Sequence, residues 1–306
     1  MMQDALFGGI NAAVLTPMRG DLSPDLAKMA AHCRFLLGNG CHGLGILGTT
    51  GEANSIGIAE RIALMEGLVA SGIPAAKLLP GTGTPALTDT VLLSESAATL
   101  GCRGVLVLPP FFYKNPTDDG LFAYFSEVIQ RTGGRVRLYL YNFPQQSAVP
   151  FSLSLIARLL KAYPGVIMGA KDSSGDFANS SAMVREFAAE GFEVYVGYDD
   201  GLQDILKAGG AGCITAAANV NSAVGARVYA GWNQAAGAEA QAVLTATRRA
   251  VVTVPLIPGL KSLMARHTAD AAWLHTRPPH LPLSAEQERA LFAAFDACGP
   301  VLARAA

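Results

Sequence analysis

A repeating alternation of short apolar runs with longer segments of helical periodicity is the sequence feature that most constrains the fold. Short apolar runs bounded by turn residues are typical of buried strands, and they occur at residues 10–16, 43–47, 76–81, 104–108, 136–141, 166–171, 194–197 and 212–216. Segments with apolar residues three and four apart follow them, at residues 24–38, 59–70, 86–100, 118–131, 153–162, 177–190, 201–208 and 222–232. Eight successive β-α units predict an α/β fold of the (β/α)8 TIM barrel type, with a doubly wound open sheet as the alternative.

From about residue 235 the pattern is helical only. Helical segments are expected at residues 238–252, 257–267 and 284–297, and prolines punctuate them. This part offers no strand that could pair with the barrel, so it is expected to form a C-terminal helical extension. The sequence therefore predicts a catalytic barrel domain at residues 1–234 and a helical extension at residues 235–306.

Composition and charge exclude several classes of partner. The chain of 306 residues is 51% hydrophobic and carries a net charge of -1 without a basic block, which argues against nucleic acid and against an anionic membrane surface. No apolar run approaches the roughly 18 residues of a membrane span, and the first residues lack the pattern of a signal peptide. The five scattered cysteines, without a C-x-x-C pair, are typical of buried thiols in a reducing compartment. We therefore expect a cytoplasmic protein, and because its histidines show no zinc-site spacing we expect no metal.

Lys171 ends the sixth apolar run and is followed at once by the polar and glycine residues at positions 172–176. The carboxyl ends of the strands of an α/β barrel carry the loops that build the active site. Burial among apolar residues favours a neutral amine over an ammonium, and a desolvated lysine is the nucleophile with which Schiff-base enzymes attack carbonyl groups. The structural alternative is a lysine that buries its stem and exposes its amine to solvent.

The turn after the second expected strand, residues 48–52, reads GTTGE. Its consecutive backbone amides, with the hydroxyls of Thr49 and Thr50, are suited to hold a small carboxylate at the mouth of a barrel. An ordinary turn rich in hydrogen-bonding residues would have the same composition. Residues 43–48 have the spelling of a dinucleotide fingerprint, but that fingerprint must follow a strand and open a helix. Here the glycines lie within the expected strand, so a dinucleotide cofactor is not expected.

Aromatic residues cluster at the ends of the fourth and fifth expected strands. Tyr139 and Tyr141 share one face of the fifth strand by alternation, and a phenol at the strand end could act as a general acid and base. The alternative is a core tyrosine with a satisfied hydroxyl. Residues 109–116 form an aromatic loop that includes Tyr113, either at the same rim or packed at a subunit interface. Donors, phenols and a lysine gathered at one rim are what a catalytic site on this fold requires.

The chain resembles the dihydrodipicolinate synthase / N-acetylneuraminate lyase family of Schiff-base, pyruvate-handling barrels, nearly from end to end. The motifs that carry the resemblance are residues 13–17 (AVLTP), 48–52 (GTTGE), the aromatic loop to Tyr113, 141–144 (YNFP), 169–172 (GAKD), and 212–214 (GCI) leading to Asn219. The resemblance implies the barrel fold, pyruvate or another 2-oxo acid as the small-molecule partner, and a substrate held covalently on the protein without a separate cofactor.

The resemblance also implies a role for each site residue. Lys171 would form the Schiff base with pyruvate, Tyr141 would shuttle protons, and Thr49 would link Tyr141 to Tyr113 in a hydrogen-bonded relay. Tyr113 would reach in from a neighbouring subunit, which implies a homo-oligomer, either a dimer or a tetramer. The turn at residues 48–50 would hold the pyruvate carboxylate. The implied substrate-binding residues are Gly48, Thr50, Gln146 and Ile214.

One departure from the family pattern bears on the substrate. After the Tyr-Asn strand end, the synthases carry an arginine that receives the carboxylate of aspartate semialdehyde, and Gln146 stands where that arginine would fall. Ala148 replaces the glycine two places on, and the aromatic loop is one residue longer before Tyr113. We therefore expect a class I lyase or aldolase, acting on a carbon-carbon or carbon-oxygen bond, that interconverts a 4-hydroxy-2-oxo acid with pyruvate and an aldehyde.

Three alternatives stay open at this point. The chain could be 4-hydroxy-tetrahydrodipicolinate synthase itself, which condenses pyruvate with aspartate semialdehyde. It could be a non-catalytic pyruvate-binding regulatory protein on the same fold, although the intact lysine, tyrosine and threonine set argues against this. A dinucleotide oxidoreductase is the third and most distant alternative, because the glycine spelling lies in the wrong context.

Overall fold

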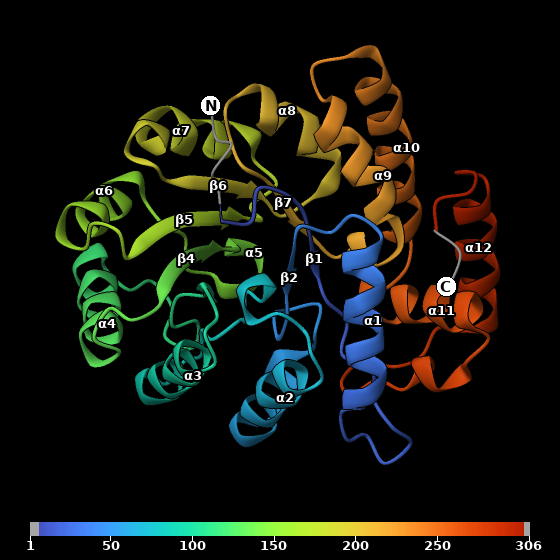
Figure 1. Cartoon of the computed structure of the whole chain (residues 1–306), viewed down its shortest axis with the longest axis horizontal. Coiled ribbons are helices and arrows are strands. Elements are labelled where there is room, and N and C mark those ends of the chain that lie inside the picture. The colour runs from blue at the N-terminus through green and yellow to red at the C-terminus, as the bar shows by residue number, and fades with distance from the viewer. Residues whose placement is uncertain (1–5, 303–306) are drawn as a thin grey trace.

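Seven parallel strands form the centre of the molecule in the computed structural model, which describes residues 6–302 (Figure 1). Neighbouring strands follow the order β2-β1-β7-β6-β5-β4-β3, and helices surround them on the outside (Figure 1). The strands are β1 (Gly9–Ala13), β2 (Gly43–Gly45), β3 (Gly104–Val107), β4 (Arg137–Asn142), β5 (Ile167–Asp172), β6 (Glu193–Val196) and β7 (Gly212–Thr215).

The sheet closes between β2 and β3 through residues 78–82. Backbone hydrogen bonds join this segment to β2 on one side and to β3 on the other, but its bridges are isolated. The expectation of a regular strand at residues 76–81 is therefore wrong: that stretch begins within a 3-10 helix, η2 (Ala75–Lys77), and Pro80 has no N–H to donate to a strand ladder. With this segment in the eighth place, the expected (β/α)8 TIM barrel is confirmed.

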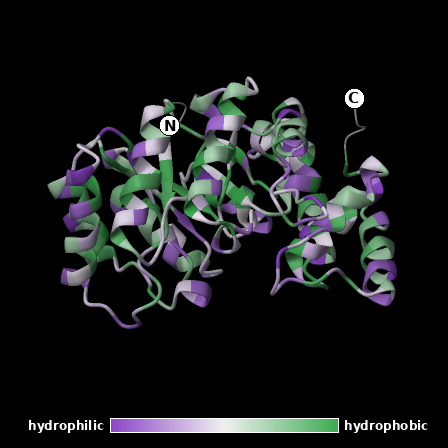
Figure 2. Cartoon of the chain, turned by 90° about the horizontal axis from the view of Figure 1, so that it is seen from below, coloured by the Kyte–Doolittle hydropathy of each residue, from purple (hydrophilic) through white to green (hydrophobic). Residues whose placement is uncertain are grey.

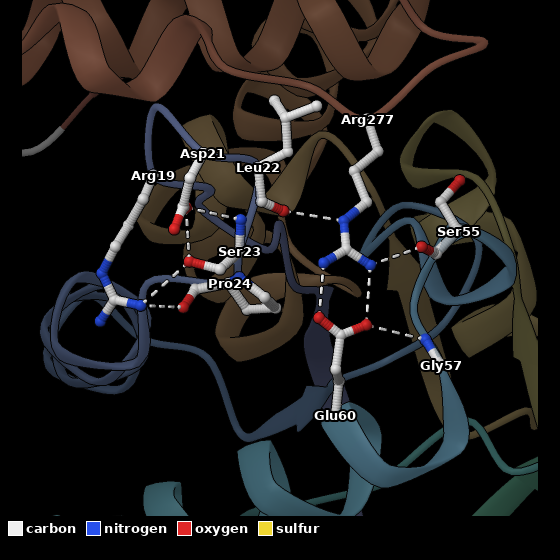
Figure 3. Close-up of polar contacts among 9 residues, drawn as sticks. All are labelled: Arg19, Asp21, Leu22, Ser23, Pro24, Ser55, Gly57, Glu60 and Arg277. Carbon is white, nitrogen blue, oxygen red and sulfur yellow. Dashed lines mark hydrogen bonds and ion pairs between the residues drawn. The ribbon is translucent and has the colours of Figure 1, made fainter.

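Nine α-helices and three further 3-10 helices connect the strands within the described part of the chain. The first begins two residues later than the expected segment at residues 24–38, because Asp25 caps it and accepts a 3.0 Å hydrogen bond from the Lys28 amide. Ser23 instead donates to Asp21 within the preceding turn (Figure 3). The helices are α1 (Leu26–Gly38), η1 (Ala53–Ser55), α2 (Ile58–Ala70), α3 (Leu87–Thr99), α4 (Asp118–Arg131), α5 (Pro144–Ser147), α6 (Leu153–Ala162), α7 (Phe177–Phe187), η3 (Ala188–Glu190), η4 (Asp199–Gly201), α8 (Leu202–Lys207) and α9 (Ala218–Gly231).

Large side chains fill the interior of the barrel. Tyr139 of β4 and Tyr195 of β6 are completely buried, and both hydroxyls donate to the Glu193 carboxylate, at 2.8 and 2.6 Å. Gly169 of β5 permits this close packing, because a Cβ there would lie 2.2 Å from the Glu193 carbonyl oxygen. The interior is thus a packed core and not a pore, so a substrate site can open only where the strands end.

The chain after residue 234 is helical throughout its described part. It consists of α10 (Ala235–Val251), α11 (Leu256–Thr268), η5 (Ala271–Leu274) and α12 (Ala285–Asp296). These elements, orange to red in Figure 1, lie to one side of the barrel, where α10 and α11 pack against α9. The helices in Figure 2 carry both hydrophobic and hydrophilic residues, as expected for helices that cover a core with one face. The domain boundary at residue 234 stays a prediction; α10 begins next to it.

Arg277, in the segment after η5, fastens this extension to the barrel (Figure 3). Its guanidinium pairs through two nitrogens with the Glu60 carboxylate of α2. It also donates to the carbonyls of Leu22 (2.8 Å) and Ser55 (2.6 Å). The hydrogen bond from Arg277 lowers the pKa of Glu60. One side chain of the extension thus binds the turn before α1 and the start of α2 together.

A second ion pair, between Lys261 of α11 and Glu52, is completely buried. The Lys261 amine also donates to the His275 carbonyl (2.8 Å), and the other Glu52 oxygen accepts from the Arg277 amide (3.0 Å). Burial lowers the pKa of Lys261, and the charge of Glu52 opposes this shift. Because Glu52 ends the turn after β2, the extension holds that turn in place.

The helices and the cysteines of residues 6–302 bear on membrane insertion and on disulfide bonding. No single helix in it has the length and apolarity to cross a membrane; α10 and α11 reach those values only as a pair, and they are bent by 109° at the break between them. Its cysteines are all unpaired, and each is buried except Cys298, which is half-buried.

Candidate active site

A cavity of ≈ 670 Å³ opens at the carboxyl ends of the strands, the end at which active sites of this fold lie. Its wall combines residues that follow β2, β4, β5, β6 and β7 with residues of α10, α11 and the segment after η5. Five of the residues expected from the sequence meet in this wall: Thr49, Thr50, Tyr141, Gln146 and Lys171.

Lys171 lies in the wall with only 5% of its surface exposed, so it is not the solvent-exposed lysine of the structural alternative. It is the last residue but one of β5, because the strand continues to Asp172, one residue beyond the expected end. The strand register pairs it with Tyr141 and Tyr195. Lys171 Nζ lies 4.2 Å from the centroid of the Tyr141 ring. The amine and this phenol can therefore act on one bound molecule.

Tyr141 joins Lys171 to the turn after β2. Its hydroxyl lies 3.3 Å from Thr49 Oγ1, and either oxygen can be the donor. The side chain is 3% exposed and its ring stacks on Phe143, with centroids 5.8 Å apart. Tyr139 belongs to the same interior cluster, as strand alternation predicts. A phenol held in this way, between a hydroxyl and an amine, has the placement that a general acid and base needs.

The turn after β2 is held by its own backbone. The Glu52 amide donates to the Thr49 carbonyl (3.1 Å), and the Ala53 amide donates to the Gly48 carbonyl (3.2 Å). Thr50 is buried and lines the main cavity, whereas Gly48 lies in a smaller recess that also touches Thr49. The two threonines are therefore presented to the cavity by a turn that cannot easily rearrange.

Asp172, next to Lys171, has no role assigned from the sequence. Its carboxylate is completely buried, and each of its oxygens accepts two hydrogen bonds. Burial of a charged carboxylate is tolerated only when such partners are in place, so the network locks the ends of β4 and β5 against the start of α7. The one feature of the sequence that could have drawn attention to Asp172 is its position directly after Lys171. The donors are Asn142 (2.8 Å), Ser174 (3.0 Å), Asn179 (2.9 Å) and Ser180 (2.7 Å).

Gln146 and Ile214 take different places. Gln146 lies on the short helix α5, is exposed, and contributes to the cavity wall. Ile214 of β7 is completely buried in the interior cluster that also contains Tyr141. It therefore supports the site from within the core of the barrel.

The aromatic loop before α4 lies apart from the cavity wall. Phe112 and Tyr113 are 70% and 77% exposed, and their rings pack on one another with centroids 5.3 Å apart. The Lys114 amine donates to the carbonyls of Phe111 and Ser147, the latter at 3.3 Å. A single chain therefore does not bring Tyr113 to Thr49, and the relay through Tyr113 stays a prediction.

Residues that sequence reasoning missed complete the wall on the side of β6. They are Tyr198 and Asp200 after that strand, Arg248 of α10, and His280 after η5. Asp199 lies completely buried beneath them; burial raises its pKa, and the charge of Arg248 opposes this shift. No local pattern marks Arg248, which is one of two adjacent arginines on an amphipathic helix. Only the position of α10 over the end of β6 brings it to the cavity.

Within residues 6–302, no cluster of three or more His, Cys, Asp or Glu side chains is placed to hold a metal ion. The expectation that the chain uses neither a metal nor a separate cofactor stays a prediction.

Comparison with known sequences identifies relatives over most of the chain. A model of the dihydrodipicolinate synthetase family matches residues 6–297. An uncharacterised DapA-like lyase of Chloroflexus aurantiacus is 36% identical over 290 residues, which are 94% of this chain and 96% of that protein. A 4-hydroxy-tetrahydrodipicolinate synthase of Listeria monocytogenes is 32% identical over 214 residues, which are 70% of this chain and 71% of that protein.

Solved structures with the same fold include two that share more than a quarter of their residues with this chain. Dihydrodipicolinate synthase from Agrobacterium tumefaciens is 32% identical with a TM-score of 0.87, over 95% of this chain and 99% of that one. A prophage protein of the dihydrodipicolinic acid synthase family from E. coli K12, solved in complex with pyruvate, is 27% identical with a TM-score of 0.90, over 97% of this chain and 100% of that one.

Proposed function

We propose, from the premise that this chain belongs to the dihydrodipicolinate synthetase family, that it interconverts a 4-hydroxy-2-oxo acid with pyruvate and an aldehyde through a Schiff base on Lys171. Membership places the chain among pyruvate-dependent lyases and aldolases. The observation that carries the finer proposal is the meeting, in one cavity, of a buried lysine amine, a phenol 4.2 Å from it as measured to the ring centroid, and a threonine hydroxyl 3.3 Å from the phenol.

The proposed reaction begins with attack of the neutral Lys171 amine on C2 of the 2-oxo acid. Tyr141 carries a proton from the amine to the carbonyl oxygen, and then gives its own proton to that oxygen as water leaves. A protonated imine and a phenolate result. The substrate carboxylate is held by the amides and hydroxyls of Thr49 and Thr50, which fixes the attacked carbon over the amine.

Bond cleavage uses the imine nitrogen as the electron acceptor. The Tyr141 phenolate removes the proton of the C4 hydroxyl, the C3–C4 bond breaks, and its electron pair moves through C2 to the nitrogen, so that an enamine and a free aldehyde form. The phenol then protonates C3. Water adds to the imine of pyruvate, releases pyruvate and the Lys171 amine, and restores the proton on Tyr141. Condensation is the same sequence in reverse.

Gln146 favours a substrate whose aldehyde half carries a hydroxyl group near this residue. An arginine would offer a charged, two-pronged donor for a carboxylate, whereas a glutamine offers a neutral amide that can both donate and accept. Gln146 is exposed to the cavity on α5. We infer that this position contacts a hydroxyl or an uncharged group of the aldehyde half of the substrate.

We also propose that the protein is a homo-oligomer and that it is located in the cytoplasm. The Phe112–Tyr113 pair is an exposed aromatic patch, of a kind that isolated subunits rarely present. We infer that a homo-oligomer covers it and brings Tyr113 of one subunit toward Thr49 of another. Sedimentation at micromolar concentration should show a dimer or tetramer; an active monomer would contradict the inference. A cytoplasmic location accords with the unpaired cysteines of the described chain.

Trapping tests the covalent step directly. The protein is incubated with pyruvate, reduced with borohydride, and digested, and the modified peptide is identified by mass. The adduct is expected on Lys171 and should be absent from Lys171→Arg, which keeps a long basic side chain but has no competent nucleophile. Lys261 is an internal control, because it is also buried but lies in an ion pair. An adduct on another lysine, or none, would overturn the proposal.

The second candidate is 4-hydroxy-tetrahydrodipicolinate synthase, favoured by the name of the relative from Listeria monocytogenes. Trapping cannot separate the two, since both use pyruvate. A screen of pyruvate release from 4-hydroxy-2-oxo acids, run beside condensation with aspartate semialdehyde, does so. The proposal fails if condensation proceeds at a normal kcat/KM of about 10⁴ M⁻¹s⁻¹ or more while no hydroxylated oxo acid is cleaved.

A further inference from the structure

Arg248 is a cation in the cavity wall that forms no ion pair with another residue in the part of the chain that the structure describes. It lies on α10 and is half-buried. No ion pair within residues 6–302 includes it, in contrast to Glu52 of the same wall, which is paired with Lys261. An arginine left without a partner in a concave site is available to a ligand.

The position of Arg248 is set by the packing of α10 over η4. Gln241, seven residues earlier and hence on the same face of the helix, donates from Nε2 to the carbonyls of Asp199 (3.1 Å) and Asp200 (3.2 Å). Gln241 Oε1 accepts from the Gln203 amide (3.0 Å). The helix is thus anchored to the segment after β6, so the arginine is carried to the wall by a rigid element.

A purely structural role, as counter-charge to buried Asp199, explains these contacts less well. The Asp199 carboxylate already accepts hydrogen bonds from Thr215 (3.0 Å) and from Asn221 (2.7 Å). Within the described residues, Arg248 forms no ion pair with this carboxylate. The guanidinium thus acts on Asp199 only through its charge, and it donates no hydrogen bond to an acceptor within residues 6–302.

We propose that Arg248 binds a second carboxylate at the far end of the substrate, so that the preferred substrate is a 2-oxo diacid. The inference rests on the function proposed above. Cavity size supports it: the six heavy atoms of pyruvate occupy roughly 200 Å³ if each takes the ~30 Å³ of a liquid water. The cavity measures ≈ 670 Å³, so a longer molecule is accommodated.

The two polar positions serve different parts of such a substrate. Gln146 follows β4, and Arg248 lies beside the end of β6, with β5 and its Lys171 between them in the sheet. A substrate anchored on Lys171 can therefore place a hydroxyl toward one side and its terminal acid toward the other. One guanidinium offers the fork that a carboxylate fits, and Asp200 of the same cavity wall disfavours a group of higher negative charge, such as phosphate.

Binding of two 2-oxo acids of equal length tests the inference without turnover. 2-Oxoadipate ends in a carboxylate and 2-oxohexanoate ends in a methyl group. Calorimetric Kd values are measured for the unmodified protein, Arg248→Gln, Arg248→Lys and Arg249→Gln. Arg249 is the matched control, because it is the adjacent arginine on α10 and is exposed outside the cavity wall.

The unmodified protein and Arg249→Gln should bind the diacid about tenfold to a hundredfold more tightly than the monoacid, as expected for a charge-assisted hydrogen-bonded pair. Arg248→Gln should lose this preference while its affinity for 2-oxohexanoate stays the same, and Arg248→Lys should keep part of it. In turnover, Arg248→Gln should raise KM for 4-hydroxy-2-oxoadipate with little change in kcat, and leave 4-hydroxy-2-oxohexanoate unaffected.

Equal affinity of the unmodified protein for the two acids, or binding of neither acid, would overturn the inference. This measurement requires no variant. So would an equal loss for both acids in Arg248→Gln, which is the signature of a structural role. Should Arg248→Gln fail to fold, Arg248→Lys and the unmodified protein decide the matter. Trapping separates this from the proposed function: an adduct on Lys171 without a diacid preference refutes only the role of Arg248, and a preference without an adduct refutes only the Schiff base.

Discussion

The buried pair between Lys261 and Glu52 allows the link between extension and barrel to be tested by one substitution, Lys261→Met. Both side chains are completely buried. Methionine keeps most of the side-chain volume but removes the amine, which leaves the Glu52 carboxylate with the Arg277 amide as its described hydrogen-bond partner (3.0 Å). Removal of one partner from a buried ion pair costs about 3–5 kcal/mol, because an uncompensated charge stays in the core.

This cost converts into a measurable change in melting temperature. The entropy of unfolding is about 2.1 cal/mol/K per residue, so a chain of 306 residues unfolds with about 0.64 kcal/mol/K. A loss of 3–5 kcal/mol therefore lowers Tm by about 5–8 °C. Thermal melting followed by circular dichroism is the assay, and Lys207→Met is the matched control, because Lys207 is exposed at the end of α8.

A double variant separates the charge from the packing. In Glu52→Gln with Lys261→Met the uncompensated charge is gone, so the double variant should be more stable than Lys261→Met alone, although it still lacks the amine's bond to the His275 carbonyl. The reasoning is refuted if Lys261→Met melts with the Lys207→Met control, or if the double variant is as unstable as the sum of its two single substitutions.

Three further predictions concern chemistry, specificity and pH. Tyr141→Phe should fold normally and lose about 10²- to 10⁴-fold in turnover; near-normal turnover would show that the phenol is only structural. Gln146→Arg should shift the ratio of semialdehyde condensation to hydroxy-acid cleavage upward by about tenfold, and a change that is equal for both reactions would contradict the assigned role. Burial lowers the pKa of His32 from 6.5 to about 4, against the opposing hydrogen bond of Asn219. As pH falls, the unfolded chain therefore binds this proton before the folded protein does. The contribution of His32 to the free energy of unfolding is fully present above pH 6.5 and falls by about 3 kcal/mol by pH 4. Between pH 6.5 and pH 4 the free energy of unfolding of His32→Gln should fall by about 3 kcal/mol less than that of the unmodified protein, as measured by denaturant unfolding at each pH, and an equal fall would count against the assignment.

The position of Lys171 was predictable from the sequence because two local rules combine there. A buried strand is written as a short apolar run that ends at turn residues, and a parallel barrel collects the carboxyl ends of its strands at one rim. The end of β5 differs from the expectation by one residue. Tyr141, at the end of β4, follows by the same reasoning, and its hydrogen-bond distance to Thr49 confirms that the two strand ends meet.

The errors have local physical causes. The segment at residues 76–81 has the apolar character of a strand, but Pro80 interrupts the ladder, so only isolated bridges form there. The start of α1 was expected two residues early, at residue 24, because two polar residues that can cap a helix, Ser23 and Asp25, precede it, and only the geometry of the turn shows that Ser23 donates to Asp21. Both errors arise from the hydrogen bonds of single residues, which the periodicity of apolar residues does not reveal.

The sequence by itself determined the order of β-α units, and with it the barrel, the rim, and the lysine and phenol that meet there, because each depends on residues close together in the chain. Only the tertiary structure decided that Arg248 lies in the cavity wall, that Lys261 holds the turn ending at Glu52, and that Arg277 pairs with Glu60. These three depend on contacts between segments far apart in sequence. Such contacts arise from how whole elements pack, and no local pattern of polar and apolar residues records them.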